Sequence, residues 1–173
     1  MMYIGLISDT HCVFDDSLRE FLKPVDEIWH AGDFGNLATR DIIADFKPLK
    51  GVFGNCDSYC VRQVHPEYLS FDADGVGVLM MHIGGYPGHY SRRALQLVGQ
   101  FKPQLFVCGH SHILKVYYDK AYGMMTMNPG AAGILGFHQV RTALRFHIDT
   151  GKIHDLEVGQ WPRTFIEPIE DKI

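Results

Sequence analysis

Five short motifs along the sequence contain side chains that can bind metal ions. In chain order they are Asp9-Thr10-His11, Gly32-Asp33, Gly54-Asn55-Cys56-Asp57, His82 and Gly109-His110-Ser111-His112. Seven of their residues offer a carboxylate, amide or imidazole donor, namely Asp9, His11, Asp33, Asn55, His82, His110 and His112. Donors of these kinds suit divalent ions such as manganese, iron, cobalt, nickel and zinc, without selecting one of them.

The seven donors are enough to hold two ions. If Asp33 bridges the ions, one is completed by Asp9, His11 and His112 and the other by Asn55, His82 and His110. Alternate residues of an extended segment point the same way, so both donors of Asp-x-His or His-x-His can face one cavity. Two ions about 3.5–4 Å apart can lower the pKa of a bridging water and hold a phosphoryl oxygen while hydroxide attacks in line. The pattern therefore favours hydrolysis of a phosphoester.

Each motif taken alone also has a structural explanation. An isolated Asp-x-His occurs by chance in many sequences, and Gly-Asp and Gly-Asn are ordinary turn dipeptides. A single histidine such as His82 is more often a hydrogen-bonded, partly buried residue. All five motifs in order, each after a predicted strand, favour one shared site over five separate structural roles.

Short apolar runs predict the strands that must position these motifs. The runs cover residues 3–7, 27–30, 51–53, 76–81 and 105–108. Apolar residues at helical spacing predict helices over residues 16–22, 37–46 and 91–101. Ligands bind at the carboxyl ends of strands in α/β sheets, so we expect the five motifs to meet at such an edge.

The second half of the sequence is richer in predicted strands. Runs at residues 116–118, 124–127, 142–148 and 153–158 predict an antiparallel meander, with a hairpin turn at Asp149-Thr150-Gly151-Lys152. The stretch between residues 54 and 75 shows no clear period and is predicted to be irregular. Together these elements predict an α/β fold, with two sheets packed face to face and helices outside.

Composition limits the possible partners and locations. The 173 residues predict one domain spanning 1–173. Lys and Arg total 16 against 20 for Asp and Glu, so we expect no stable nucleic-acid complex. No apolar run approaches the roughly 18 residues that cross a membrane, and the N-terminus lacks a signal-peptide pattern. We therefore expect no membrane contact. The four cysteines form no CxxC pair and are few for a disulfide scaffold, so we expect a cytoplasmic protein.

The five motifs resemble those of the calcineurin-like metallophosphoesterases. That family's motifs run D-x-H, G-D, G-N-H-[DE], a histidine commonly followed by Gly, and G-H-x-H. Asn128-Pro129-Gly130 resembles the family's N-P-G segment, so the resemblance extends from Met2 to about Gly130. The length is most similar to the small prokaryotic phosphodiesterase branch.

The resemblance implies a fold, a cofactor and a reaction. The fold is a four-layer α/β/β/α sandwich of two mixed sheets. The cofactor is a pair of divalent ions, most often manganese, with nickel, iron, zinc or magnesium as alternatives. The reaction is hydrolysis of a phosphodiester, in a small molecule or nucleotide, by a metal-bound hydroxide. In this scheme Asn55, His82 and His110 have catalytic as well as metal-binding roles.

Two residues depart from the family pattern. Cys56 stands where many members carry the histidine proposed to protonate the leaving group, and a thiol with a pKa near 8.5 is a poor substitute for an imidazole near 6.5. We therefore expect diesters, or esters with good leaving groups, to be preferred; a packing role under the site is the alternative for Cys56. His82 precedes Ile83 rather than Gly, which makes His89 a rival ligand. The role of Asp57 stays open, with a turn cap as one explanation.

Other readings of the chain remain. The same motifs would fit a phosphomonoesterase, or a metal-binding scaffold for protein–protein interaction like a trafficking subunit of this fold. Among the other histidines, His30 is expected in the core and His138 beside the cleft. His65, His147 and His154 are expected at the surface or on strand faces. The tail at residues 161–173 is expected to pack on its own domain, with a homo-oligomer contact as the alternative.

Overall fold

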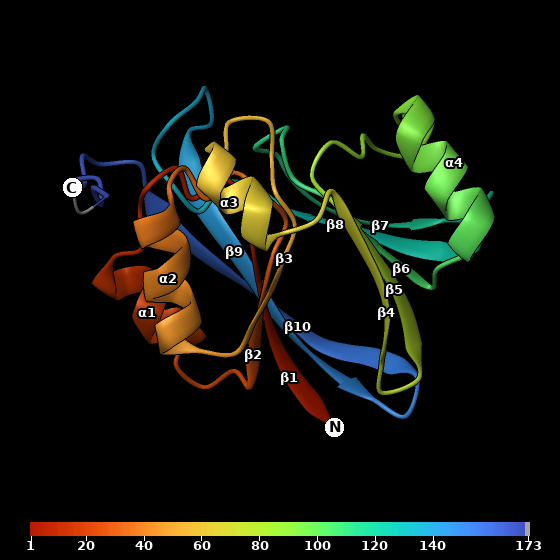
Figure 1. The fold of residues 1–173 in the computed structure, drawn as a ribbon. Coiled ribbons are helices and arrows are strands. Elements are labelled where there is room, and N and C mark those ends of the chain that lie inside the picture. The colour runs from red at the N-terminus through yellow and green to blue at the C-terminus, as the bar shows by residue number, and fades with distance from the viewer. Residues whose placement is uncertain (172–173) are drawn as a thin grey trace.

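The computed structural model describes residues 1–171, which form two five-stranded sheets with helices on their outer faces (Figure 1). Sheet A has the order β10-β9-β1-β2-β3 and sheet B the order β4-β5-β6-β8-β7. Sheet A consists of β1 (Met2–Ile7), β2 (Glu27–His30), β3 (Leu49–Gly51), β9 (Val140–Asp149) and β10 (Lys152–Pro162). Sheet B consists of β4 (Tyr68–Ala73), β5 (Val76–Met81), β6 (Leu105–Val107), β7 (Leu114–Asp119) and β8 (Met124–Pro129).

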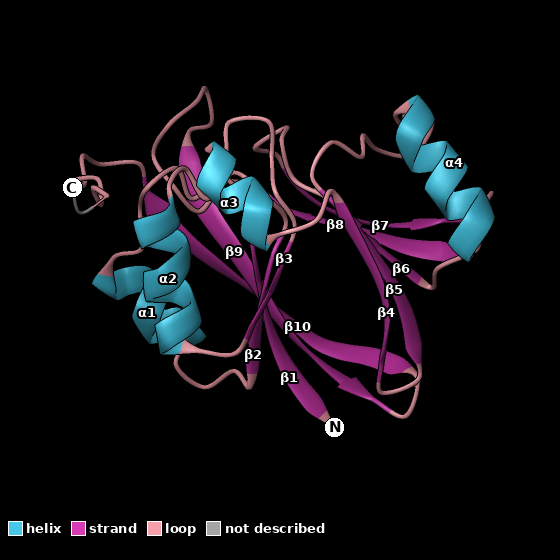
Figure 2. Cartoon of the chain, in the orientation of Figure 1, coloured by secondary structure: helices cyan, strands magenta, loops and turns pink. Residues whose placement is uncertain are grey.

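Both sheets are mixed. In sheet A, β1, β2 and β3 are parallel while β9 and β10 are antiparallel to their neighbours. In sheet B, β5, β6 and β8 are parallel and the two edge strands are antiparallel. The helices are α1 (Asp16–Leu22), α2 (Leu37–Phe46), α3 (Tyr59–Val64) and α4 (Arg92–Phe101). Figure 2 shows the first three on the side of sheet A and α4 on the outer face of sheet B. The expected four-layer α/β fold is confirmed.

Alternation along the strands creates these layers. In β5, Val78 and Met80 pack into the core between the sheets, while Leu79 and Met81 pack with α4. In β1, Leu6 belongs to the core between the sheets and Ile7 to the cluster under α1 and α2. Strands buried on both faces need apolar residues at successive positions, which is why these runs are visible in the sequence.

Two elements were missing from the expected pattern. Strand β4 pairs antiparallel with β5 through a turn at Asp74-Gly75, where both residues have positive φ (48° and 87°). Asp-Gly is a strong hairpin signal, so this strand could have been predicted from its turn. Helix α3 is six residues long and buries Val61 alone, which is too little to show a helical period. The third strand also ends at Gly51 rather than covering residues 51–53.

The predicted meander is wrong in its connectivity. β8 lies in sheet B between β6 and β7, whereas β9 lies in sheet A beside β1. The chain therefore crosses between the sheets after Pro129 instead of turning back on itself. The predicted turn between the last two strands is confirmed, since Asp149 pairs with Lys152 and both intervening residues have positive φ (46° and 81°).

The described part of the tail packs on its own chain, as expected. Ile169 joins the cluster beneath the sheet A helices, and its carbonyl accepts a 2.7 Å hydrogen bond from Asn36 Nδ2. The Ala38 N–H donates to Asp171 Oδ1 at 2.9 Å. The last two residues of the predicted tail lie outside the described part. Among residues 1–171, no helix is long and apolar enough to cross a membrane.

Candidate metal centre

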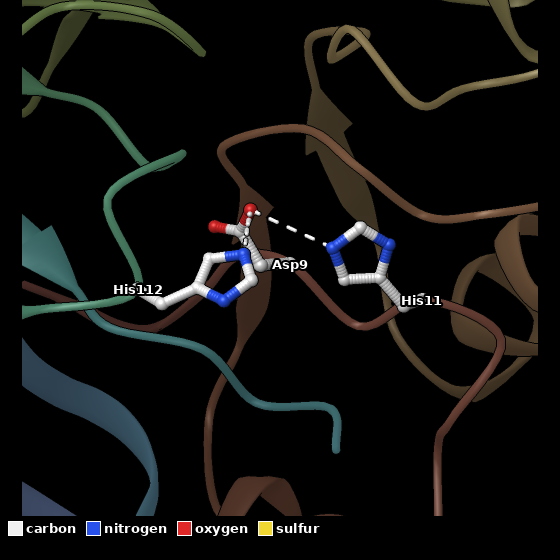
Figure 3. Close-up of side chains that lie close together, drawn as sticks. All are labelled: Asp9, His11 and His112. Atoms are coloured by element: carbon white, nitrogen blue, oxygen red, sulfur yellow. Dashed lines mark ion pairs between the residues drawn. The ribbon is translucent and has the colours of Figure 1, made fainter. Parts of the chain in front are cut away.

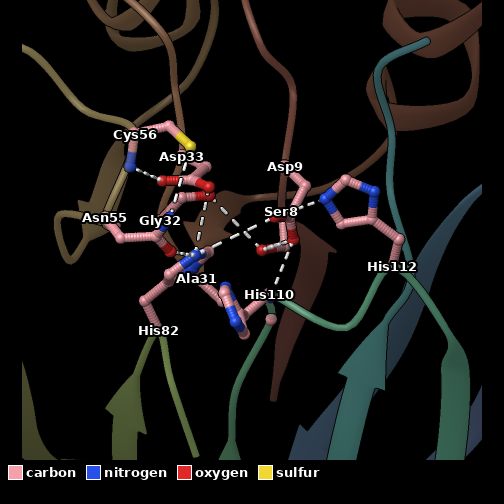
Figure 4. A network of polar contacts seen from close by, with 12 residues as sticks. Ser8, Asp9, Ala31, Gly32, Asp33, Asn55, Cys56, His82, His110 and His112 are labelled. Carbon is pink, nitrogen blue, oxygen red and sulfur yellow. Dashed lines mark hydrogen bonds and ion pairs between the residues drawn. The ribbon is translucent and has the colours of Figure 1, made fainter. Parts of the chain in front are cut away.

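Loops at one edge of both sheets bring the seven predicted donors close together. Sheet A contributes Asp9, His11, Asp33 and Asn55, and sheet B contributes His82, His110 and His112. Figure 4 shows Asp9, Asp33, Asn55, His82, His110 and His112 gathered between the ends of the two sheets, and Figure 3 shows His11 beside Asp9. Neither sheet holds the complete set, so the site depends on how the sheets pack.

One half of the cluster centres on Asp9. The ligand atoms of Asp9, His11 and His112 all lie within 4.8 Å of one another. Figure 3 shows the three side chains close together. Asp9 Oδ1 is 3.0 Å from His112 Nε2 and 3.9 Å from His11 Nε2. This is the triad expected to hold one ion.

The other half centres on Asp33 and His82. His82 Nε2 lies 3.2 Å from Asp33 Oδ2 and 3.1 Å from Asn55 Oδ1. Asp33 Oδ2 also lies 3.7 Å from His11 Nε2, so it reaches both halves, as a bridging carboxylate must. Asp9 Oδ1 is 3.9 Å from His82 Nε2 and reaches both halves as well, which the sequence did not indicate. The ring of His110 stands edge-on to that of His82, with 5.3 Å between centroids.

The backbone at the site is left-handed rather than extended. Positive φ angles occur at five of the seven donors: Asp9 (53°), His11 (45°), Asp33 (60°), His110 (68°) and His112 (57°). The expectation that Asp-x-His and His-x-His present their donors from extended segments is therefore wrong. Left-handed conformation costs about 1–3 kcal/mol per residue outside glycine and is concentrated at functional sites, because the surrounding structure must hold it in place.

The Asp57 carboxylate holds the loop of one of these donors, Asp33, in place. It accepts hydrogen bonds from the N–H groups of Asp33 (3.0 Å), Gly35 (2.9 Å) and Gly54 (2.7 Å). It therefore ties the loop after β2 to the loop after β3. Burial raises the pKa of the Asp57 carboxyl, and these N–H groups oppose that rise. Its position one residue after Cys56 did not reveal this role, because two of its three partners, Asp33 and Gly35, lie 24 and 22 residues away in the sequence.

A glycine is required where the two loops touch. A Cβ added at Gly54 would collide with the side chain and backbone of Asp33. The glycine therefore lets the loop that carries Asn55 approach the Asp33 carboxylate.

The donors fit a metal ion. Among the described residues, buried Asp9 Oδ1 has no hydrogen-bond partner, while Oδ2 accepts from Ser8 Oγ (2.6 Å) and the His110 N–H (3.0 Å). An orphaned buried carboxylate oxygen is costly unless a cation faces it. His82 Nδ1 lies 2.7 Å from the Ala31 carbonyl, which can only accept, so Nδ1 donates to it and Nε2 is the ring nitrogen that faces the cluster.

The charges of the cluster also suit a cation. Burial opposes ionisation of Asp33, but the hydrogen bond and charge of His82 outweigh it and hold the pKa of Asp33 below its ordinary range. Burial lowers the pKa of His11, against the opposing charges of Asp33 and Asp9. Ionised carboxylates and neutral imidazoles are the protonation states that metal binding requires.

A cleft of about 470 Å³ opens onto the cluster. It is lined by donors of the cluster such as His11, Asp33 and His110 and by the exposed side chains of Ile113, Leu135 and Phe137. His138 lines it as expected, with its ring 5.2 Å from that of His112. A second cleft of about 370 Å³ lies on the other side of Asn55, lined by residues that include Arg62 and Arg93.

Cys56 lines the first cleft and is exposed, so it does not pack beneath the site. Its N–H donates to Asp33 Oδ1 at 2.8 Å, and its sulfur lies within 4.8 Å of ligand atoms of His11 and Asp33. Burial and the charge of Asp33 raise the pKa of the Cys56 thiol.

Three other histidines test the sequence expectations. His89 lies on an exposed loop with its ring 4.8 Å from Tyr86, and the polar contacts of the cluster do not include it. His30 is fully buried, as expected. His65 is also buried, and the expectation of a surface position is wrong, because its ring stacks on Phe34 at 4.9 Å.

A family model described as the calcineurin-like phosphoesterase superfamily domain matches residues 2–151. The chain belongs to this superfamily. A search of curated proteins finds no significant match. The metal-dependence typical of the superfamily agrees with the acidic and histidine groups of the site.

Solved structures share the fold. A Thermotoga maritima protein, TM1076, is 26% identical, with a TM-score of 0.71, and the alignment covers 93% of this chain and 100% of that one. Entamoeba histolytica Vps29 complexed with zinc is 18% identical, with a TM-score of 0.71 and coverage of 94% and 100%. An archaeal phosphodiesterase is 18% identical, with a TM-score of 0.70 and coverage of 91% and 99%. The superfamily fold thus extends over nearly the whole chain.

Proposed function

We propose that this protein is a metal-dependent phosphodiesterase. The observation that carries the proposal is the orphaned, buried Asp9 Oδ1, which faces two overlapping groups of carboxylate and imidazole donors in a phosphoesterase fold. When bound, two divalent ions would supply a nucleophile from water at neutral pH and offset the charge of the phosphoryl oxygens. Manganese is the first expectation, with nickel, iron, zinc and magnesium as alternatives.

Each residue has a role in this proposal. Asp9, His11 and His112 would hold one ion, Asn55, His82 and His110 the other, and Asp33 would lie between them. Asn55 turns its Oδ1 toward His82 Nε2, while its Nδ2 contacts only the exposed Cys56 sulfur at 3.3 Å. The amide N–H₂ is therefore available to donate to a substrate phosphate, which makes Asn55 and the neighbouring His82 and His110 the catalytic candidates.

Two features favour diesters over monoesters. The raised pKa of Cys56 makes it a poor proton donor to an alkoxide leaving group, so esters whose leaving group needs little protonation are favoured. The exposed apolar lining of the cleft, above all Phe137, offers a surface to a second ester substituent such as a nucleobase. We expect the substrate to be a small phosphodiester or nucleotide and the place of action to be the cytoplasm.

The test begins with removal of metal by a chelator. The stripped protein is reloaded separately with manganese, nickel, iron, zinc or magnesium and assayed on generic aryl phosphodiesters and phosphomonoesters. We expect at least one metal to restore hydrolysis, with diesters turned over faster than alkyl monoesters. A preference for monoesters would make the protein a phosphomonoesterase, and the absence of hydrolysis with every metal would overturn the enzymatic proposal.

The second candidate function is a metal-binding scaffold for protein–protein contact. It is favoured by the fold similarity to Vps29 proteins, one of which was solved with zinc. The complete set of four histidines and two carboxylates argues for the enzyme, because a scaffold does not need all of them. The reloading assay separates the two, since a scaffold binds metal without hydrolysing an ester.

A further inference from the structure

A second group of possible metal ligands lies at the opposite end of β1 from the candidate active site. His147 on β9 and His154 and Asp155 on β10 offer ligand atoms that all lie within 4.8 Å of one another. His147 is paired with Tyr3 in the sheet, six residues before Asp9. At about 3.3 Å per strand residue the two sites are roughly 20 Å apart. In Figure 1 the β9–β10 hairpin and the N-terminus lie at the bottom, away from the loops of the site.

The two histidines are direct cross-strand partners. His147 pairs with His154 in the antiparallel register of β9 and β10, and their rings stack with 5.5 Å between centroids and 13° between planes. Directly opposed residues on antiparallel strands place their side chains on the same face of the sheet. The pair therefore presents two imidazoles side by side.

An irregularity in β10 brings the third ligand to the same face. In a regular strand Asp155 would point away from His154, because successive side chains alternate. The register shifts between His154 and Glu157, and Asp155 has a φ of 52°. Such a bulge re-aims a side chain, and here it turns the Asp155 carboxylate toward the imidazoles.

The Asp155 carboxylate lies close to a nitrogen of each imidazole. Asp155 Oδ2 lies 2.9 Å from His154 Nδ1 and 4.0 Å from His147 Nδ1. Two ligands bound to zinc at about 2.0–2.2 Å lie roughly 3–4 Å apart. His147 Nδ1 is buried and has no hydrogen-bond partner within residues 1–171, although the cluster contains an acceptor. The ring of Tyr3 stacks on His147 at 4.0 Å and 10°, which holds this nitrogen in place.

We propose that His147, His154 and Asp155 form a binding site for one zinc, nickel or copper(II) ion, separate from the candidate catalytic centre. Two imidazoles and one carboxylate suit these ions better than magnesium or calcium, which prefer all-oxygen sites. The His154 side chain is 40% exposed and that of Asp155 73%, so water completes the coordination. The bound ion joins β9 to β10 across the bulge and stabilises this hairpin.

The experiment compares the wild type with His154→Gln and Asp155→Asn. His154→Gln removes one ligand from a half-exposed position, and Asp155→Asn keeps a residue that tolerates positive φ while removing the charge. His89→Gln, which changes an exposed histidine outside both groups, is the matched control. After dialysis against zinc, we expect wild type and His89→Gln to contain one more ion per chain than His154→Gln and Asp155→Asn. Phosphodiester turnover should be the same in all four proteins.

A second readout does not depend on metal counting or on activity. Zinc should shift the imidazole ¹⁵N resonances of His147 and His154 and slow amide hydrogen exchange in β9 and β10 of the wild type, but not of His154→Gln. Equal zinc content in the wild type and His154→Gln would overturn the proposal. So would unchanged His147 and His154 resonances at millimolar zinc. Failure of the phosphodiesterase assay would leave both of these readouts unaffected.

Discussion

His82 and His30 are both buried near the carboxyl ends of strands, yet their surroundings drive the two imidazoles in opposite directions. His82 faces Asp33 and Asp9, and these carboxylates raise its pKa although burial opposes them. His30 bonds to the Thr10 hydroxyl at 2.9 Å and stacks on Phe34 at 3.6 Å; burial and the charge of His65 lower its pKa well below the ordinary value. Both imidazoles are buried, so the nearby carboxylates, rather than burial, distinguish the candidate ligand His82 from the packing residue His30.

The packing region extends through a second histidine. Phe34 lies between the rings of His30 and His65, so three rings form one stack behind the loop that carries Asp33. The Gly32 N–H donates to His30 Nδ1, which is the bond of a neutral imidazole. This uncharged stack supports the loop of the charged cluster, because Phe34 directly follows Asp33.

The largest effect is expected from Asp33→Asn, which removes the negative charge that faces His82. His82 and His11 then lose a shared anion, and a divalent ion loses the carboxylate that reaches both halves of the cluster. We expect phosphodiester turnover to fall by about 10³-fold or more, since metal stabilisation of the transition state amounts to several kcal/mol. Metal content per chain, measured alongside, should fall too. Asp45→Asn on the exposed face of α2 is the control, and an equal loss in both variants would contradict the assignment.

The contribution of His65 and its ring stack to the stability of the fold should depend on pH. Burial and the charge of Arg40 lower the pKa of His65 to about 4. A group whose folded-state pKa lies below its unfolded value near 6.5 stabilises the fold fully above pH 6.5, and this contribution is lost as the pH falls toward 4. The loss from His65 reaches about 3 kcal/mol.

Denaturant unfolding between pH 7 and 4 measures this loss. His65→Gln should lower stability at pH 7, because the ring stack is broken, but flatten the pH dependence. His89→Gln should leave the slope as in the wild type. A wild-type slope retained in His65→Gln would show that His65 does not titrate with folding.

A smaller effect, on metal affinity, is expected from Asp57→Asn, which alters none of the histidines directly. The amide keeps one acceptor oxygen for three N–H donors, so the loops after β2 and β3 lose part of their connection. We expect a loss of about 10–100-fold in metal affinity, as for partners that orient metal ligands. Turnover should recover largely at high metal concentration. Recovery in Asp33→Asn as well would mean that the two carboxylates do not differ in role.

The smallest effect is expected from adding a histidine next to Asp33. Cys56→His would place an imidazole beside Asp33, where it can protonate a leaving group. We expect the ratio of monoester to diester kcat/KM to rise a few-fold, less than the roughly 10²–10⁴-fold of a fully positioned general acid. Cys60→His, at an exposed position on α3, is the control. A ratio unchanged from the wild type would remove Cys56 from the explanation of substrate preference.

The sequence predicted those parts of the fold whose apolar pattern is unambiguous. β1, β2, β5 and β6 are buried on both faces and appear as continuous apolar runs, and α4 has a strong apolar face. α3 and β4 were missed because α3 is too short to show a period and β4 is only half-buried. The pairing of strands was harder to predict than their positions, because β8 and β9 follow each other in the sequence but belong to different sheets.

By itself, the sequence determined the seven donors, their order and the strands that precede them, because donor chemistry and apolar periodicity are properties of residue type and spacing. Only the tertiary structure decided which groups surround these donors. It placed Asp9 as a second carboxylate within reach of both halves, gave Asp57 its three backbone partners, and buried His65 against Phe34. Charge, burial and hydrogen bonding depend on neighbours in space, and these neighbours come from strands and loops far apart in the chain.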